Sequence, residues 1–280
     1  MTLSLGLPTG IHVYGQYKLW YVNVNVNINV KFINYIWYFE PESGMIAVGF
    51  FESAQGRDMP PKRKKLDIDR FVEILTQAYK QWSAPIITFI ANRGATPFEV
   101  LVSTILSLRT KDEVTSQAAA RLFDQARTPQ GLLDLGEAAI ARLIYPVGFY
   151  PTKARRLVEI SRIILAQYGG KVPDSLDALL ELPGVGRKTA NLVMVEGFKQ
   201  DAICVDTHVH RISNRIGYVA TRTPEQTESA LREKLPRKHW IRYNELLVAF
   251  GQVVCRPVSP FCSRCPVSGM CPRIGVKRSR

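Results

Sequence analysis

From residue 67 onwards the chain carries apolar residues at helical spacing, and this pattern constrains the possible folds more than any other feature. The first apolar face is formed by Ile68, Phe71, Leu75, Tyr79 and Trp82. TPFE at 96–99 has the sequence of a capping box with proline at the first helical position, and TPEQ at 223–226 repeats it. Further helices are predicted over 113–126, 137–145, 152–168, 175–181, 187–198, 207–216, 224–234 and 239–254. Because extended runs are scarce, we expect an all-α body of short helices.

The chain is strongly basic, since 37 Lys and Arg residues oppose 24 Asp and Glu residues, a formal net charge of +13. Six basic residues and no acidic residue lie in 255–280, and KRKK occupies 62–65. Such an excess is typical of proteins that bind a polyanion, above all nucleic acid, although a basic surface without a partner is the alternative.

The first twenty residues lack the features of a signal peptide, and no apolar run of about 18 residues occurs. We therefore expect an intracellular protein, either cytoplasmic and nucleoid-associated or, in a eukaryote, nuclear.

Residues 1–66 differ from the rest of the chain. VNVNVNINV at 22–30 alternates with period two and predicts a strand, but no neighbouring segment offers a clear hairpin partner. The stretch ESAQGRDMPPKRKK marks a boundary, and Met59 within it would serve as a natural start. We expect residues 1–66 to be a strand-like or disordered leader outside the helical fold, either a mis-assigned start or a small accessory element.

Four of the five cysteines stand close together in CRPVSPFCSRCPVSGMC at 255–271, with the spacing C-x6-C-x2-C-x5-C. The odd number and the clustering argue against a disulfide framework and for a metal site. Cys255, Cys262, Cys265 and Cys271 can surround one compact centre, and spacing alone leaves a zinc ion and a [4Fe–4S] cluster as comparable options. Cys204 lies in the apolar run AICV and is predicted to be a buried core residue.

A glycine-containing turn, LPGVG at 182–186, separates two predicted helices. Gly184 and Gly186 allow backbone conformations that expose peptide N–H groups, and the next helix adds the positive end of its dipole. No Ser, Thr or Asp caps that helix, so a phosphate is the expected partner of its free donors. The alternative is a simple turn that joins two packed helices.

Lys188 lies one turn into this helix, and Asp206 precedes a further helix 18 residues later. An amine and a carboxylate that meet in a cleft form a catalytic pair, because the amine can act as a nucleophile while the carboxylate orients it and carries protons. Alternatively, Lys188 is a solvated surface cation.

LPGVGRKTANLV at 182–193 and VDTHVHRISNRIG at 205–217 resemble the endonuclease III branch of the helix-hairpin-helix DNA glycosylases. The resemblance covers residues 67–272. It implies that Gly184, Val185, Gly186 and Arg187 bind a DNA phosphate, that Lys188 attacks the sugar C1′ of a damaged nucleotide, and that Asp206 assists it.

The implied function is a bifunctional DNA glycosylase and AP lyase of base excision repair, which forms a Schiff base and cuts the abasic strand by β-elimination. Oxidised pyrimidines are the expected lesions. The expected partner is double-stranded DNA with damaged bases or abasic sites, bound by a monomer. Two alternatives are an adenine-mismatch monofunctional glycosylase, a branch that lacks the lysine, and a non-catalytic DNA-binding module.

The resemblance also implies that the four clustered cysteines hold a [4Fe–4S] cluster, whose loop would set Arg256 and Arg264 against the DNA backbone. In LSLRTKD at 106–112, Arg109 stands where the family usually has a glutamine that enters the base stack. In VGFYPTKA at 147–154, Phe149 stands at the position of an apolar wedge. His208 either orients the site or contacts phosphate, or is a structural histidine.

The implied architecture has two helical domains. A helical-barrel domain covers 90–200 and contains the hairpin, and an iron–sulfur domain combines 67–89 with 201–272. A basic tail follows over 273–280.

Overall fold

The computed structural model describes residues 11–14, 17–22, 34–39, 46–51 and 66–280. The chain divides into two compact units, Met1–Lys64 and Lys65–Arg280, which differ in their secondary structure.

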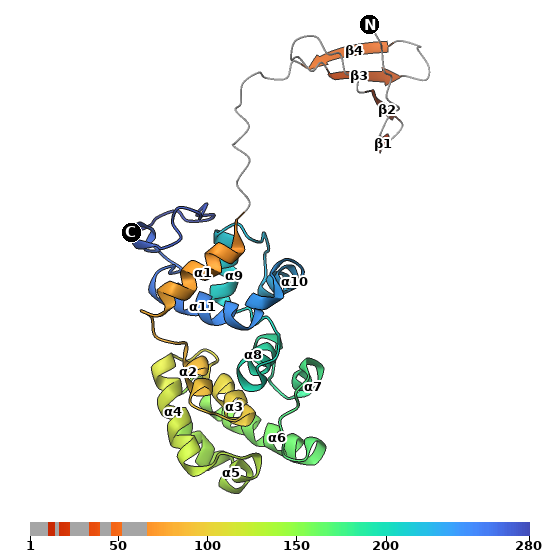
Figure 1. The fold of residues 1–280 in the computed structure, drawn as a ribbon. Helices are drawn as coiled ribbons and strands as arrows, with labels where there is room; N and C mark the ends of the chain where they lie inside the picture. Colours follow the sequence, from red (N-terminus) through yellow and green to blue (C-terminus); the bar gives the residue numbers. More distant parts are fainter. Residues whose placement is uncertain (1–10, 15–16, 23–33, 40–45, 52–65) are drawn as a thin grey trace. The chain divides into compact units, whose positions relative to one another are not determined.

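The described part of the first unit is an antiparallel sheet with the strand order β1-β2-β3-β4 (Figure 1). The strands are β1 (Ile11–Tyr14), β2 (Tyr17–Val22), β3 (Asn34–Phe39) and β4 (Ile46–Phe51). Val22, at the start of the predicted strand 22–30, pairs with Tyr35, so the expectation that no hairpin partner lies nearby is wrong there. The partner is the aromatic run that follows, and aromatic residues favour strands. Residues 23–30 of the predicted strand lie outside the described residues.

The second unit is helical, and no strand occurs in its described residues, 66–280, which confirms the expected all-α body. Its first helices are α1 (Ile68–Tyr79), α2 (Ile86–Asn92), α3 (Pro97–Ser107), α4 (Asp112–Gln125), α5 (Pro129–Ile144) and α6 (Tyr150–Tyr168). These are followed by α7 (Leu176–Glu181), α8 (Arg187–Phe198), α9 (Thr207–Arg215), α10 (Pro224–Lys234), the short 3-10 helix η1 (Arg237–His239), α11 (Trp240–Val253) and η2 (Cys262–Arg264).

The capping box predicted at 96–99 is present. The Oγ1 of Thr96 accepts the N–H of Glu99 at 3.3 Å, and the Glu99 carboxylate accepts the N–H of Thr96 at 2.7 Å. At the second site Thr223 accepts the N–H of Gln226, but the Gln226 side chain returns to the N–H of Arg222 instead of that of Thr223. Both helices therefore begin where their sequences indicate.

Two helices differ from the expectation. The short helix α2 was not predicted, because a seven-residue apolar stretch carries too little periodic signal to separate it from a loop. The helix predicted from residue 137 is the second half of α5, which starts at Pro129 and is interrupted by Gly136 at φ 74° and ψ 164°. Glycine tolerates this conformation, so the chain bends there without ending the element.

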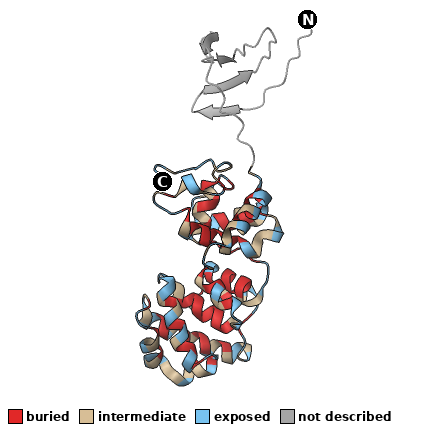
Figure 2. Ribbon diagram, turned by 60° about the vertical axis from the view of Figure 1, so that its left-hand side comes forward, coloured by how far each residue is buried: buried red, intermediate tan, exposed pale blue. Residues whose placement is uncertain are grey.

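Two hydrophobic cores organise the helical unit, and Figure 2 shows their buried residues inside both groups of helices. Core 1 is the set of buried apolar residues from Ile87 to Cys204 apart from Ile203, contributed by α2 to α8, their connections and the segment after α8. Core 2 is the set contributed by α1, α9, α10, α11 and the C-terminal loop. Phe71 and Leu75 of α1 join Tyr243 and Phe250 of α11 there, so the first helix packs against the last α-helix (Figure 1).

The extended segment between α8 and α9 connects the two cores. Ala202 and Cys204 belong to core 1, whereas Ile203 and Val205 belong to core 2. Successive side chains of an extended segment point in opposite directions, which explains the alternation. Cys204 is 1% exposed, so its predicted place in the core is confirmed.

Within the described residues, no helix is long and apolar enough to cross a membrane.

Candidate functional site

The hairpin between α7 and α8 has the geometry of an anion-binding turn. Gly184 has φ +80°, a conformation that favours glycine, and the N–H of Val185 closes the turn on the carbonyl of Leu182 at 3.1 Å. Gly186 precedes α8, and no side chain caps this helix. The first N–H groups of α8 therefore have no side-chain cap, at the positive end of the helix dipole.

Lys188 and Asp206 both adjoin the segment that joins the two cores, Lys188 through a contact with Cys204 and Asp206 as the residue that follows Val205. Lys188 is exposed in the first turn of α8, and its carbonyl accepts the thiol of Cys204 at 3.5 Å. Asp206 caps α9, because its Oδ1 accepts the N–H groups of His208 and Val209 at 2.8 and 2.9 Å. No ion pair joins the Lys188 amine to the Asp206 carboxylate in this structure, although both charges act on His208. Their catalytic pairing stays a prediction.

His208 is linked to the first clustered cysteine through Arg211, to which sequence reasoning gave no role. The Arg211 guanidinium lies 3.0 Å from Nδ1 of His208 and donates to the carbonyl of Cys255 at 2.9 Å. Burial lowers the pKa of His208, with a smaller opposing effect of the Asp206 charge. A Cβ at Gly251 of α11 would lie 2.2 Å from Nδ1 of His208, so only glycine leaves room for this ring.

Arg187, predicted to contact DNA, has a second role within the protein. It donates two hydrogen bonds, at 2.6 and 3.1 Å, to the carboxylate of Glu228 on α10. Arg232 donates to the same carboxylate at 3.0 Å and to the side chain of Asn191 on α8 at 3.0 Å. Burial raises the pKa of Glu228, but the hydrogen bonds from the two arginines outweigh this effect, and the net pKa lies below its ordinary value. This network ties the hairpin helix to α10.

Arg109 and Phe149, predicted separately from two loops, lie together. Both have left-handed φ values, 55° and 60°, and the Arg109 guanidinium carbon lies 5.1 Å from the centre of the Phe149 ring. The Phe149 side chain is exposed to solvent. The structure therefore presents an exposed aromatic ring and a cation side by side.

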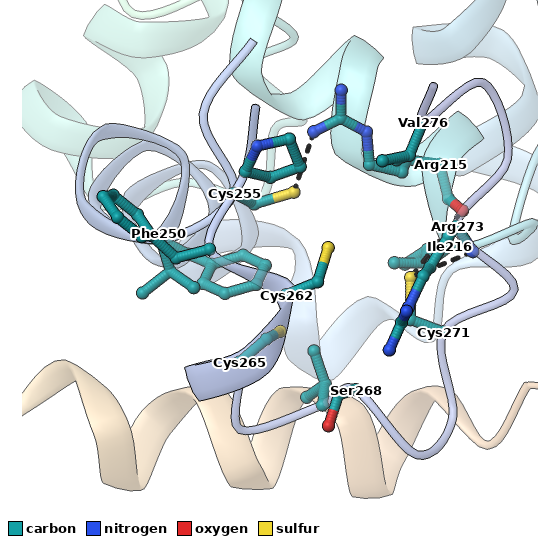
Figure 3. Close-up of a pocket in the computed structure, with 14 residues that line it drawn as sticks. Arg215, Ile216, Phe250, Cys255, Cys262, Cys265, Ser268, Cys271, Arg273 and Val276 are labelled. Carbon is teal, nitrogen blue, oxygen red and sulfur yellow. Dashed lines mark hydrogen bonds between the residues drawn. The ribbon is translucent and has the colours of Figure 1, made fainter. Parts of the chain in front are cut away.

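The four clustered cysteines line one pocket, together with apolar side chains that include Phe250 (Figure 3). All four thiols are free. Two sulfur atoms accept hydrogen bonds, Cys255 from the Arg215 guanidinium at 3.2 Å and Cys271 from the N–H of Arg273 at 3.4 Å. Burial raises the pKa of Cys265 to about 11. In the described residues, no group of three or more His, Cys, Asp or Glu side chains is placed to hold a single metal ion.

The loop that carries these cysteines also gathers arginines around Phe261. The guanidinium carbons of Arg256, Arg264 and Arg280 lie 5.2, 3.9 and 4.2 Å from the centre of this ring. The Arg280 backbone donates to the carbonyl of Pro260 at 2.8 Å and accepts from the N–H of Ser263 at 3.0 Å. The predicted basic tail therefore folds back onto this loop and adds to its positive charge.

A comparison with known families places residues 102–237 in a model of the HhH-GPD superfamily of base excision DNA repair proteins. Endonuclease III of Thermotoga maritima is 54% identical to this chain over 175 residues, which make up 62% of this chain and 82% of that protein. The chloroplastic endonuclease III homolog 1 of Arabidopsis thaliana is 46% identical over 184 residues, 62% of this chain, and the match spans 48% of that longer protein.

A solved structure of a trapped covalent intermediate between endonuclease III and DNA is similar in fold. Its TM-score is 0.63 at 30% sequence identity, and the match covers 74% of this chain and 97% of that one.

We predict that Gly184→Ala destabilises the protein more than Gly186→Ala does. Alanine at φ +80° costs about 1–2 kcal/mol for a left-handed conformation. Gly186 has φ −97° and open space around a Cβ, so its substitution loses only the N-cap preference of glycine over alanine, about 0.5 kcal/mol. Urea unfolding of both variants measures the difference. Equal losses would contradict the assigned turn.

We predict that Glu228→Gln lowers the free energy of unfolding by about 1–3 kcal/mol at pH 7, because the two arginines lose a charged acceptor. The folded-state pKa of Glu228 lies below 4.5, so its ionised form contributes stability above that pH. This contribution is lost as the pH falls through the folded-state pKa. The difference in the free energy of unfolding between wild type and Glu228→Gln should therefore be smaller at pH 4 than at pH 7.

Urea titrations at both pH values measure this gap. Glu73→Gln is the matched control, since Glu73 forms an exposed pair with Arg70 and should change stability little at either pH. A gap for Glu228→Gln that does not depend on pH would refute the ionic role.

Proposed function

Since the chain belongs to the endonuclease III family, we propose that it is a bifunctional DNA glycosylase and AP lyase of base excision repair. The observation that carries the proposal is the place of Lys188, exposed in the first turn of α8 directly after a glycine hairpin, with its carbonyl bonded to Cys204 in the segment that leads to Asp206. The proposal includes double-stranded DNA with damaged bases, oxidised pyrimidines among them, or abasic sites as substrate. It also includes a monomeric state and an intracellular location.

The hairpin would bind one phosphate of the damaged strand. The N–H groups of Gly186 and of the first turn of α8 would donate to the phosphate oxygens, with Gly184 and Val185 shaping the turn. The ion pair with Glu228 keeps the Arg187 guanidinium beside the turn, so Arg187 would add positive charge from a fixed position. His208, at the start of α9, would orient this site or contact the phosphate.

The chemistry would begin when Nζ of Lys188 forms a bond to C1′ and the bond from C1′ to the damaged base breaks, with the electron pair leaving on the base. Oδ1 of Asp206 already accepts two N–H groups, which leaves Oδ2 to take up the amine proton. The sugar ring then opens to a Schiff base. Loss of a proton from C2′ and departure of the 3′ phosphate would cut the strand.

The damaged nucleotide must leave the duplex before Lys188 can reach C1′. The exposed ring of Phe149 is suited to stack against the bases that remain. Arg109 would contact the base left without a partner, or a nearby phosphate, through its donors.

The four cysteines fit the [4Fe–4S] cluster that the family resemblance implies. Their free thiols surround one pocket with apolar walls, and N–H donors already reach two of the sulfur atoms. A cluster bound by Cys255, Cys262, Cys265 and Cys271 would crosslink the loop through four iron–sulfur bonds. Arg256 and Arg264 on this loop would then face the DNA backbone as fixed cations.

We also propose the two-domain division on the basis of the two cores. A barrel domain at 90–200 would follow core 1, and an iron–sulfur domain at 67–89 and 201–272 would follow core 2. The cleft for the extruded nucleotide would lie between the two cores, beside the first turns of α8 and α9.

We predict that Lys188→Gln abolishes the covalent adduct that borohydride traps on abasic-site DNA, because glutamine cannot form a Schiff base. Lys199→Gln is the matched control: this lysine ends the same helix and pairs with Glu196, so its adduct should form at the wild-type level. DNA affinity is measured in parallel. Wild-type protein that binds DNA without forming an adduct would support a docking module instead.

We predict that Cys265→Ala lowers the iron content and the visible absorption of the purified protein. Cys204→Ala is the control, because this buried thiol lies in core 1, away from the pocket. Iron and sulfide analysis of both variants measures the effect. An equal loss in both, or no loss in Cys265→Ala, would refute the assignment of the ligands.

A further inference from the structure

Lys153 on α6 is a buried lysine that the proposed chemistry does not use. It is 7% exposed, and its Nζ donates to the carbonyls of Leu106 and Leu108 at 2.8 and 2.6 Å and to Oγ1 of Thr110 at 3.3 Å. All three acceptors are uncharged and lie in the segment that ends α3 and leads to α4. Burial lowers the pKa of Lys153 to about 8. An ammonium group in such a position costs free energy that these hydrogen bonds offset.

Thr110 joins this segment to a second loop, the one that precedes α6. Its Oγ1 accepts from Lys153 and from the N–H of Gly148 at 3.1 Å, and it donates to the carbonyl of Leu108 at 3.3 Å. A Cβ at Gly148 would lie 2.7 Å from the carbonyl oxygen of Arg109, so the two backbones touch. Lys153, Thr110 and Gly148 thus form one hydrogen-bonded clamp between the loops.

The clamp binds the sequence neighbours of two residues with unusual backbone conformations. Arg109 and Phe149 both have φ near +60°, which non-glycine residues rarely adopt and which costs each about 1 kcal/mol. The residues on both sides of Arg109, Leu108 and Thr110, accept hydrogen bonds from Lys153. Gly148, which precedes Phe149, donates its N–H to Thr110. The strained backbone presents the Phe149 ring, 60% exposed, beneath the Arg109 cation.

We infer that Lys153 is a positioning residue that holds Arg109 and Phe149 together as a single rigid wedge for opening the base stack. The inference rests on the proposed function, in which the damaged nucleotide is extruded. A rigid wedge loses little conformational entropy when it enters the duplex, so more of its stacking energy is available for extrusion. Lys153 itself stays buried and touches neither DNA nor the reacting atoms.

The experiment compares wild type with Lys153→Met and Thr110→Val, each of which removes clamp hydrogen bonds with little change in volume. The probe is a duplex with an uncleavable tetrahydrofuran abasic analogue opposite 2-aminopurine, whose fluorescence rises on unstacking. Both variants should bind this duplex with affinity close to wild type, because the hairpin and the arginine-rich loop are intact. Their fluorescence rise should be smaller, and adduct formation on abasic-site DNA under single-turnover conditions about 10-fold or more slower.

Thr110→Ser keeps the hydroxyl and should restore both signals. Lys153→Met should slow a Phe149→Ala protein little further, since both changes disable the same wedge. Additive losses, or full fluorescence and wild-type rates in both clamp variants, would overturn the inference. If Lys153→Met does not fold, the two Thr110 variants carry the test. Reduced signals in Thr110→Val and restored signals in Thr110→Ser would support the inference, and wild-type signals in Thr110→Val would overturn it. A wild-type protein that forms no adduct would instead refute the proposed function.

Discussion

The four residues Ala202 to Val205 fix the relation between the two groups of helices, because they insert alternately into core 1 and core 2. A change in their register by one residue would exchange the side chains buried in each core. The same segment bonds to α8 through the Cys204 thiol and to α11 through the amide of Asn244, which donates to the Cys204 carbonyl at 3.1 Å. The positions of Lys188 and Asp206 are therefore set by the packing of this segment between the two cores. No ion pair between the two side chains is needed to hold them.

Several arginine side chains of α8, α9 and α10 are fixed by hydrogen bonds to other groups of the protein. Arg187 and Arg232 share Glu228, and Arg211 donates to the carbonyl of Cys255. Each contact restricts a side chain that would otherwise lose rotamer entropy on meeting a polyanion. The net charge of +13 thus attracts DNA at long range, while these contacts decide where positive charge stands at close range.

The sequence alone predicts those features that depend on neighbours along the chain. The capping box at Thr96, the helices on either side of Gly184 and the burial of Cys204 follow from local pattern. The contacts of Lys153 with the α3–α4 segment and of Arg211 with Cys255 could not be found this way, because the accepting carbonyls lie more than 40 residues away along the chain. The lysine in YPTKA has no distinguishing neighbours, and only the packing of α6 under a distant loop reveals its acceptors. The residue roles at the hairpin and at the cysteines stay predictions from resemblance.

The structure offers two lysines that a search for a reactive amine would select, for opposite reasons. A lowered pKa favours Lys153, since a nucleophilic amine must lose its proton, and perturbed pKa values often mark catalytic groups. Yet its Nζ donates to three oxygen atoms inside the protein, so no face of the nitrogen is open to a sugar. Lys188 is exposed beside the turn that is proposed to bind a phosphate, and a phosphate held there would bring C1′ within reach. Access therefore weighs more than the pKa here: it favours the exposed Lys188 as the proposed nucleophile and the buried Lys153 as the proposed positioning residue.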